Sequence, residues 1–337
     1  MQLLSERELE LVHALQIAPR VPWAQAADIL DAHPTVLSQR WEKLRAQGAA
    51  WIAAQPQGRL RQQVFCFTEL ACPPHLRGQI TEELASLPEV LSIDLLSRNY
   101  RLGLTIIGES MPQLVYNALD RIASLPAVDS LHPSFAVQMH HSARDWRLRA
   151  LDRQQVSALS AINAEQTSTD ASLVMREEHR VILALLQRDG RCSAAQVARE
   201  TGLSAASARR QLSRVLHSEA LTLRCDMAQD YSGFPIAAQW YARVPASQHQ
   251  QAAKALAAIP NMRLVCTVTG EANLMIAMWL GSVNDLLEAE RSLEAAAPGI
   301  VLSESSLLLA SAKRMGWIVR PDSTTDGRQI ALPIPIH

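Results

Sequence analysis

The sequence predicts an α+β protein in which two three-helix segments alternate with two modules of β-α-β-β-α-β order. Residues 5–52 align without a gap to residues 176–223, and their apolar and turn positions agree, with Pro19-Arg20 opposite Gly190-Arg191. After each segment the chain repeats one succession of β-rich and helical stretches. A duplication of this length divides the 337 residues into several domains, and 48% hydrophobic residues are enough to fill their cores.

The second helical segment carries the clearer local pattern. Ser193 precedes one helical run and offers an N-cap oxygen to its unpaired N–H groups, and Ser204 does the same for the next run. Gly202 lies between the two runs, where glycine tolerates a positive φ. This pattern predicts a helix-turn-helix domain of the winged-helix type over residues 173–228.

The outward face of the last helix in that segment has residue types that bind DNA. Arginine reaches guanine edges or phosphates, and short hydroxyls allow close approach to the backbone. Residues 176–224 hold nine Arg against five Asp or Glu, a local excess of four positive charges in a chain of net charge −1. A merely solvated helix face is the alternative interpretation. The DNA-contacting residues predicted here are Ser204, Ser207, Arg209, Arg210, Ser213 and Arg214.

The first helical segment, predicted as a domain over residues 1–55, is less basic. Pro34 opens its last helix, where proline suits the first turn. Residues 1–50 carry five basic and six acidic side chains, so this copy either contacts DNA or serves only as a packing module. Trp41 and Leu44 are expected in its core. Its candidate DNA contacts are Thr35, Ser38, Gln39, Arg40 and Lys43.

The two sheet modules are predicted at residues 60–145 and 234–320. Each begins with a β-rich run, 63–72 or 238–245, followed by a helical stretch, two strands with a short polar turn, a second helix and a last strand. This is the ferredoxin-like order. Helices cover one face of such a sheet, so the other face is left for water or a partner.

The remaining segments are a connector at residues 146–172, rich in Ala, Gln, Ser and Thr, and a tail at 321–337 expected to be loose. No window is long and apolar enough to span a bilayer, and the start of the chain does not resemble a signal peptide. The five cysteines are scattered without a C-x-x-C pair, which argues against a disulfide framework or a zinc site. We expect a cytoplasmic protein with no metal and no membrane partner.

The stretch V-T-G-E-A-N-L at 268–274, followed by an apolar strand, a helix and S-E-S-S-L-L-L-A-S-A-K-R at 303–314, resembles the Lrp/AsnC ("feast/famine") family. The turn G-L-S at 202–204 resembles the helix-turn-helix of the same family. The resemblance covers nearly the whole chain, counted twice, as in tandem-duplicated members. It implies a bacterial transcriptional regulator that binds double-stranded DNA and a small effector, often an amino acid.

Carried over from this family, the effector site lies in the hairpin turn of the second module. A glycine turn exposes N–H groups that suit a carboxylate, although the glycine is also explained by the turn alone. A neutral amide replaces the usual Asp of the family, so ligand preference is expected to differ. The matching turn of the first module, residues 97–101, has no glycine and is expected to bind another ligand or none. The effector-binding candidates are Thr269, Gly270, Glu271, Asn273 and Leu274.

Family members pair two sheet modules from two chains. Because this chain carries two modules, we expect them to pair with each other as an internal pseudo-dimer, and pairing between chains is the alternative. Siroheme decarboxylases are similar in architecture and form the enzyme alternative; they need His and Arg around a tetrapyrrole carboxylate. His140-His141 is the one adjacent histidine pair here.

Other enzyme classes leave no trace in the sequence. It has no P-loop, Gly-rich dinucleotide turn, H-E-x-x-H or G-x-S-x-G motif. We therefore expect a regulator with no catalytic residues and no cofactor. A pure interaction protein is a further alternative.

Overall fold

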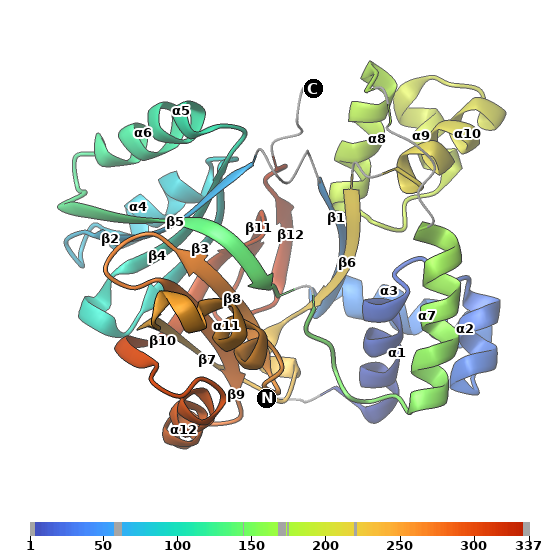
Figure 1. The fold of residues 1–337 in the computed structure, drawn as a ribbon. Coiled ribbons are helices and arrows are strands. Elements are labelled where there is room, and N and C mark those ends of the chain that lie inside the picture. Colours follow the sequence, from blue (N-terminus) through green and yellow to red (C-terminus); the bar gives the residue numbers. More distant parts are fainter. Residues whose placement is uncertain are drawn as a thin grey trace. The chain divides into compact units, whose positions relative to one another are not determined.

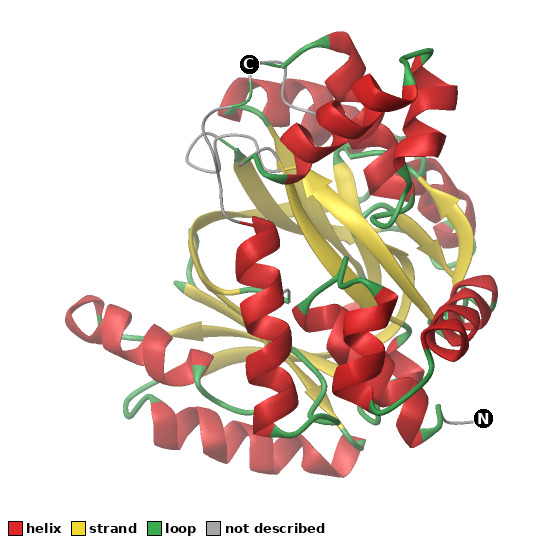
Figure 2. Cartoon of the chain, turned by 90° about the vertical axis from the view of Figure 1, so that its right-hand side faces the viewer, coloured by secondary structure: helices red, strands yellow, loops and turns green. Residues whose placement is uncertain are grey.

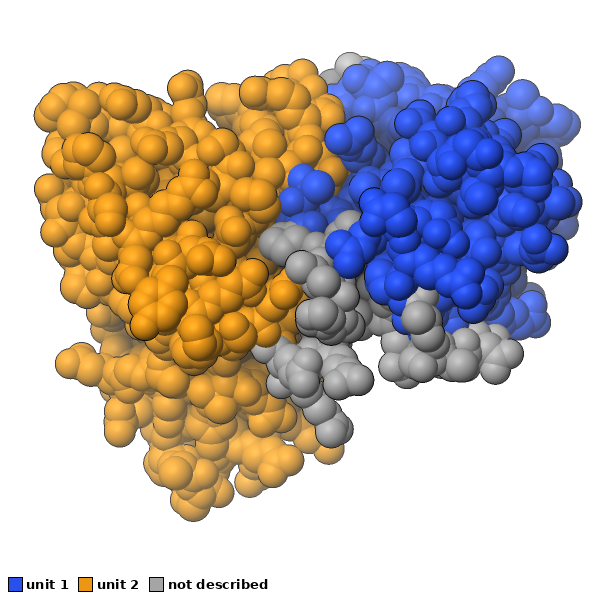
Figure 3. Space-filling model, turned by 90° about the horizontal axis from the view of Figure 1, so that it is seen from above, with its two compact units in different colours: residues 1–62, 147–228, 331–337 blue, residues 63–146, 229–330 orange. Residues whose placement is uncertain are grey.

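The computed structural model is a mixed α+β structure with two compact units (Figures 1 and 3). The structure describes residues 4–56, 63–143, 145–167, 173, 175–218 and 221–332. Unit 1 comprises residues 1–62, 147–228 and 331–337, and unit 2 comprises residues 63–146 and 229–330. Both helical segments therefore belong to unit 1 and both sheet modules to unit 2, although they alternate along the chain. The domain boundaries predicted above remain predictions.

Unit 1 has two small cores, one for each helical segment. In the first, Leu11, Leu15 and Leu37 are buried, and Trp41 and Leu44 are buried as predicted. The second is built from Ile182, Leu183, Leu186, Val197, Ala208, Leu212 and Val215. The elements are α1 (Glu6–Ile17), α2 (Trp23–Leu30), α3 (Pro34–Ala46), β1 (Ala50–Pro56), α7 (Arg153–Thr167), α8 (Glu177–Arg188), α9 (Ala194–Thr201), α10 (Ala205–Leu216) and β6 (Leu221–Met227).

The predicted caps and turn of the second segment are confirmed. The Ser193 side chain accepts a hydrogen bond from Gln196 N at 3.2 Å, and the Ser204 side chain accepts one from Ser207 N at 3.3 Å. Gly202 ends α9 with φ 72°. These three residues fix where the chain turns between α9 and α10.

The connector contains a 15-residue helix, α7, that packs on the first helical segment. Just before it, Leu151 N donates to His13 Nδ1 at 3.1 Å, and within it Gln155 Nε2 donates to Ile29 O at 3.1 Å. The part of the connector at residues 168–172 lies outside the described residues. Residues 147–167 of the connector thus belong to unit 1, and most of them form a packed helix.

The two helical segments are joined by an antiparallel ribbon of β1 and β6. Residue 5 aligns with residue 176, so equivalent residues of the two segments differ by 171 in number. In the ribbon Ala50 pairs with Met227 and Pro56 with Leu221, which places Ala53 opposite its own equivalent, Arg224. The ribbon is therefore centred on a pseudo-two-fold axis that relates the two segments.

A second set of contacts has the same symmetry. Arg20 donates to Gly190 O at 2.5 Å and to Cys192 O at 3.1 Å. Its equivalent, Arg191, donates to the two equivalent carbonyls, Pro19 O at 2.8 Å and Val21 O at 2.9 Å. Each segment thus binds the other through the same backbone positions.

Unit 2 contains two sheet modules of the predicted β-α-β-β-α-β order, and in each module the helices pack on the sheet through one core. Figure 2 distinguishes the helices (red) of the chain from its strands (yellow). A π-helical turn, Leu114–Leu119, joins α5 and α6. The first module consists of β2 (Val64–Ala71), α4 (Arg77–Ala85), β3 (Val90–Leu96), β4 (Leu102–Gly108), α5 (Met111–Gln113), α6 (Asp120–Ala123) and β5 (Ser130–His141). The second consists of β7 (Ile236–Arg243), α11 (His249–Ala257), β8 (Met262–Val268), β9 (Leu274–Leu280), α12 (Leu286–Ala296) and β10 (Val301–Arg314).

The two modules pair with each other through their edge strands. Their strand orders are β3-β4-β2-β5 and β8-β9-β7-β10, and the pairs β5–β8 and β10–β3 join them into one closed ring of strands. Ala136 pairs with Val268, and Leu308 pairs with Leu96. A shift of 172 in number converts the first pair into the second, so the modules are also related by a pseudo-two-fold axis.

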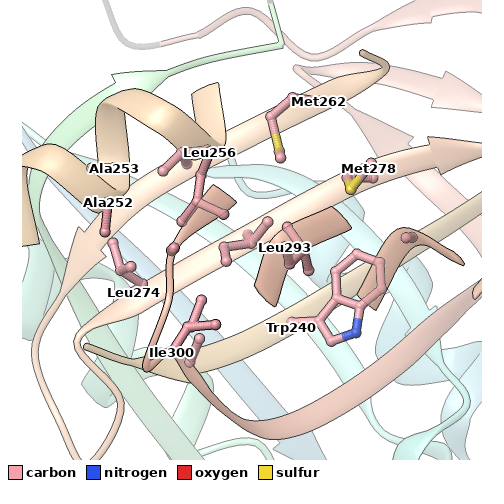
Figure 4. Close-up of a cluster of buried hydrophobic side chains, with 14 of the residues drawn as sticks. Trp240, Ala252, Ala253, Leu256, Met262, Leu274, Met278, Leu293 and Ile300 are labelled. Atoms are coloured by element: carbon pink, nitrogen blue, oxygen red, sulfur yellow. The ribbon is translucent and has the colours of Figure 1, made fainter. Parts of the chain in front are cut away.

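Each module has its own core between sheet and helices. In the second module Trp240, Leu256, Leu274 and Leu293 point into this core (Figure 4), and Trp240 Nε1 donates to Glu290 Oε1 at 3.0 Å. The opposite face carries a smaller cluster of Phe67, Cys266, Val268 and Met275, which draws on both modules.

The tail differs from the expectation that it is loose. β11 (Trp317–Val319) and β12 (Thr325–Gln329) form a hairpin that extends from β10. Trp317 and Val319 are buried, and Thr325 Oγ1 donates to Ile318 O at 3.1 Å, so apolar burial and hydrogen bonds both order the segment. Residues 333–337 lie outside the described residues. None of the described helices is long and apolar enough to cross a membrane.

Candidate functional site

The outward face of α10 gathers the DNA-contacting residues predicted for the second segment. Ala208, Leu212 and Val215 are buried and hold the helix on its core. Of the predicted contacts, Ser207 is half-buried, and the exposed ones are Ser204, Arg209, Arg210, Ser213 and Arg214. One helix thus separates an apolar face from a face of hydroxyl and guanidinium groups.

The three arginines of this face are available for an anionic partner. Within the described part of the chain, Arg209, Arg210 and Arg214 form no ion pair with a carboxylate. Arg210 Nη2 donates to Ser207 Oγ at 3.2 Å, and that contact leaves the guanidinium charge uncompensated. An exposed cluster of three such charges attracts phosphate.

The residues on the equivalent face of α3 vary more in exposure and in charge. Thr35, Gln39 and Lys43 are exposed, and Ser38 and Arg40 are half-buried. Lys43 Nζ lies 3.2 Å from Glu8 Oε1, so part of its charge is compensated within the segment. The N-cap of α3 is His33, whose ring accepts a hydrogen bond from Thr35 N at 3.3 Å.

The hairpin turn between β8 and β9 holds the effector candidates in two different environments. Thr269, Gly270 and Glu271 are exposed, and Gly270 has φ 121°. Asn273 is half-buried, and its amide is engaged twice, accepting from Val244 N at 3.0 Å and donating to Val244 O at 2.8 Å. Leu274 is fully buried in the module core. The turn thus exposes its first three candidates. It is anchored through Asn273 and Leu274, and also through Thr269, whose N–H donates to Phe135 O and whose Oγ1 accepts from Phe135 N.

The matching turn of the first module carries a polar cluster that the sequence analysis did not identify. Arg98 lies 3.0 Å from Glu69 Oε2 and 2.6 Å from Glu304 Oε1, and Arg101 lies 3.4 Å from Glu69 Oε2. Glu69 is 6% exposed, and its other oxygen has no hydrogen-bond partner among the described residues. Burial and the Glu69 carboxylate raise the pKa of the nearby Tyr241.

The sequence contains a sign of this cluster. Glu69 and Glu304 each interrupt a strand of otherwise uncharged residues, at 64–71 and 301–312. A charge inside such a run requires a partner, because an unpaired buried carboxylate is costly. The partner could not be identified from the sequence, since Arg98 and Glu304 are more than 200 positions apart.

The histidines considered for tetrapyrrole chemistry are engaged in structural contacts. His140 Nε2 lies 2.7 Å from Thr267 Oγ1, and His141 Nε2 lies 3.1 Å from Met262 O. Burial and the neighbouring His249, whose ring centroid is 6.0 Å away, lower the pKa of His140. The second module thus places a histidine near His140 that a search for adjacent histidines does not reveal. Across the described residues no group of three or more His, Cys, Asp or Glu is placed to hold a metal ion.

Comparison with known families identifies the second helical segment. Residues 175–216 match the family of winged helix-turn-helix DNA-binding domains, and this range coincides with α8, α9 and α10. The chain therefore contains a winged helix-turn-helix domain at the predicted position. No curated protein matches the sequence.

Solved structures resemble the chain at low sequence identity. The siroheme decarboxylase NirDL in complex with an iron-uroporphyrin III analogue matches 92% of this chain and 93% of its own, with a TM-score of 0.58 and 13% identity. A second structure of NirDL matches 91% and 93%, with a TM-score of 0.56 and 12% identity. AsnC of E. coli covers 41% of this chain and 94% of its own, with a TM-score of 0.35 and 19% identity. The NirDL likeness shows a common fold, and the partial AsnC match carries no weight.

Proposed function

We propose that this chain is a sequence-specific DNA-binding transcriptional regulator of the Lrp/AsnC type, modulated by a small effector such as an amino acid. The observation that carries the proposal is the coincidence of the winged helix-turn-helix match with a helix whose outward face bears three arginines that have no acidic partner among the described residues. A recognition helix needs such a face, because phosphate contacts position it and guanidinium groups read base edges.

The effector part of the proposal is supported by the β8–β9 turn. Thr269, Gly270 and Glu271 are exposed there and offer a hydroxyl, a backbone without a side chain and a carboxylate. The first two suit the carboxylate of a free amino acid, and the third suits its ammonium group. Asn273 then acts as the anchor that holds the turn, through both of its bonds to Val244.

The proposal is tested by binding of the full chain to labelled DNA from upstream of its own gene, across a salt series. Replacement of Arg209, Arg210 and Arg214 by alanine is expected to remove the preference for that DNA over random DNA. It is also expected to reduce the slope of log affinity against log salt by about 2 to 3. A matched control replaces three exposed arginines of unit 2, Arg121, Arg291 and Arg328, by alanine and makes the same change in net charge. Equal losses in both variants would contradict α10 as the reading helix.

A second candidate function is a siroheme decarboxylase-like enzyme. The observation that favours it is the fold likeness to NirDL over nearly the whole chain, together with the proximity of His140 and His249. Titration of the purified chain with siroheme distinguishes the two functions by visible absorbance. A regulator leaves the siroheme spectrum unchanged, whereas the enzyme shifts its bands with saturation at one site and loses the shift when His140 is replaced by alanine.

A further inference from the structure

Resting on the proposed function, we infer that the chain reads a non-palindromic DNA site. One half of the site is read by the arginines of α10, and the other half is read by the face of α3, which mixes polar, apolar and charged side chains. The inference follows from two recognition helices that share one symmetric frame but carry different side chains.

The frame is symmetric at the backbone. The β1–β6 ribbon is centred on the equivalent residues Ala53 and Arg224. Arg20 and Arg191 exchange hydrogen bonds with equivalent carbonyls of the opposite segment. Two independent sets of contacts thus place α3 and α10 at equivalent positions around the same axis.

The side chains on the two outward faces do not follow that symmetry. Where α10 has two adjacent exposed arginines, α3 has Ser38 and Gln39. Where α10 has exposed Ser213, α3 has Glu42, which is exposed and carries a charge that phosphate repels. The equivalent pairs, first segment named first, are Val36/Ser207, Ser38/Arg209, Gln39/Arg210, Glu42/Ser213 and Lys43/Arg214.

Contacts within each segment increase the chemical difference between the outward faces of α3 and α10. Lys43, the cation equivalent to Arg214, lies 3.2 Å from Glu8, whereas Arg214 has no ion pair among the described residues. Val36, 43% exposed, replaces the hydroxyl of Ser207 with an apolar side chain. The α3 face is thus suited to adenine through Gln39 and to a thymine methyl through Val36, while the α10 face is suited to guanine and phosphate.

The consequence concerns the symmetry of the DNA. A regulator made of two identical chains presents two identical helices, and its site is a palindrome with half-sites about one helical turn apart. Here the two helices of one chain differ at the outward positions paired above and also at Thr35/Ala206 and Arg40/Gln211. The chain therefore binds its site in one orientation, with the guanine-containing half under α10.

The test is a selection of bound duplexes from a library with about 30 random base pairs, enough for two half-sites one turn apart. The full chain is used, and the mass of the complex establishes one chain per duplex. The expected motif has two unlike halves, only one of them rich in guanine. A motif with two-fold symmetry overturns the inference but leaves the proposed function standing. Recovery of no preferred sequence overturns the proposed function, and the inference falls with it.

Two exchange variants test which helix reads which half. R209S/R210Q/R214K gives α10 the residues of α3, and it is expected to lose the guanine-rich half and about 2 from the salt slope. S38R/Q39R/K43R gives α3 the residues of α10, and it is expected to select a more symmetric, doubly guanine-rich motif with a salt slope steeper by about 2. Circular dichroism confirms that each variant is folded. If the exchanges leave both halves of the motif unchanged, the assignment of helices to half-sites is wrong.

Discussion

The two junctions between the repeats differ in how far their side chains follow the backbone symmetry. In unit 1 the central arginines follow it, because Arg20 and Arg191 donate to equivalent carbonyls, whereas the ion pair of Arg45 with Asp189 has no counterpart. In unit 2 the strand register is symmetric, but the ion pair of Arg98 with Glu304 has no counterpart. A shift of 172 puts Gly270 at the position of Arg98 and His132 at the position of Glu304.

This difference indicates which segments or modules each junction can join. The symmetric arginine contacts of unit 1 are made to backbone carbonyls, which any copy of the segment offers. The junction of unit 2 contains an ion pair whose charges are absent from the equivalent positions of the other module. This ion pair therefore forms only between one first module and one second module. Asp94 is a further case, since it accepts a hydrogen bond from Ser311, whose equivalent in the first module is the apolar Met139. Side chains can thus favour pairing within the chain while the backbone remains symmetric.

The largest expected effect comes from breaking the symmetric junction. Arg191→Ala removes two charge-assisted bonds to carbonyls and a guanidinium stacked 4.0 Å over Trp23, and burial lowers the pKa of Arg191 to about 10. The loss of unfolding free energy is expected to be about 3 kcal/mol. Arg20 makes the equivalent two bonds, but Ala194 stands at the position equivalent to Trp23, so Arg20→Ala is expected to cost about 1 kcal/mol less. Urea unfolding measures both, with the exposed Arg188→Ala as control. A difference of more than about 1.5 kcal/mol between the two variants would mean that the junction is not energetically symmetric.

A smaller effect is expected from the asymmetric junction. Arg98→Ala leaves the buried Glu69 with only the longer contact to Arg101, and it leaves Glu304 unpaired, at a cost of about 2 kcal/mol. A double-mutant cycle of Arg98→Ala with Glu304→Ala is expected to give a coupling of about 1 kcal/mol. The exposed pair Arg291–Glu288 provides the control cycle, with a coupling below about 0.5 kcal/mol. A coupling near zero for Arg98 and Glu304 would remove the charge basis for pairing one module of each kind.

The repeat made much of the fold predictable, including the element order, the caps at Ser193 and Ser204 and the turn at Gly202. The alignment of Arg20 with Arg191 was visible as well, but their contact was not, because a sequence shows equivalence and not proximity. The same limit hid the cluster of Glu69, Arg98 and Glu304, whose members come from different strands and turns. For the effector turn, the sequence placed Asn273 correctly in the hairpin but could not indicate that its amide is bound to Val244.

The helix α7 is a further source of asymmetry between the two helical segments of unit 1. This asymmetry is expected to appear in the pH dependence of stability. His13 accepts a hydrogen bond from Leu151 N, and burial together with Arg147 lowers its pKa to about 4. Its equivalent in the second segment is Ala184, so only one copy has this group. The folded protein holds His13 neutral while the unfolded chain protonates it below about pH 6.5, so stability falls as pH is lowered from 6.5 towards 4. Between pH 7 and 5.5 the expected loss is about 1 kcal/mol, and His13→Asn is expected to lack this component. A stability profile that is the same in both proteins would show that His13 is not held neutral by the fold.

The smallest effect concerns the turns that precede the two recognition helices. Gly202 and its equivalent Asp31 both have left-handed backbone, with φ 72° and 47°. A Cβ at Gly202 would meet no atom within 4 Å, so Gly202→Ala tests the backbone alone and is expected to cost about 1 kcal/mol. Asp31→Gly relieves the same strain in the first segment and is expected to add about 0.5 kcal/mol to the free energy of unfolding. This gain is smaller than the loss expected for Gly202→Ala, because Asp tolerates a left-handed backbone better than Ala does. Thermal unfolding of both variants measures the two changes in stability. Opposite signs of the two shifts are expected, since one change introduces the strain that the other removes, and equal signs would mean that the two turns are not equivalent in conformation.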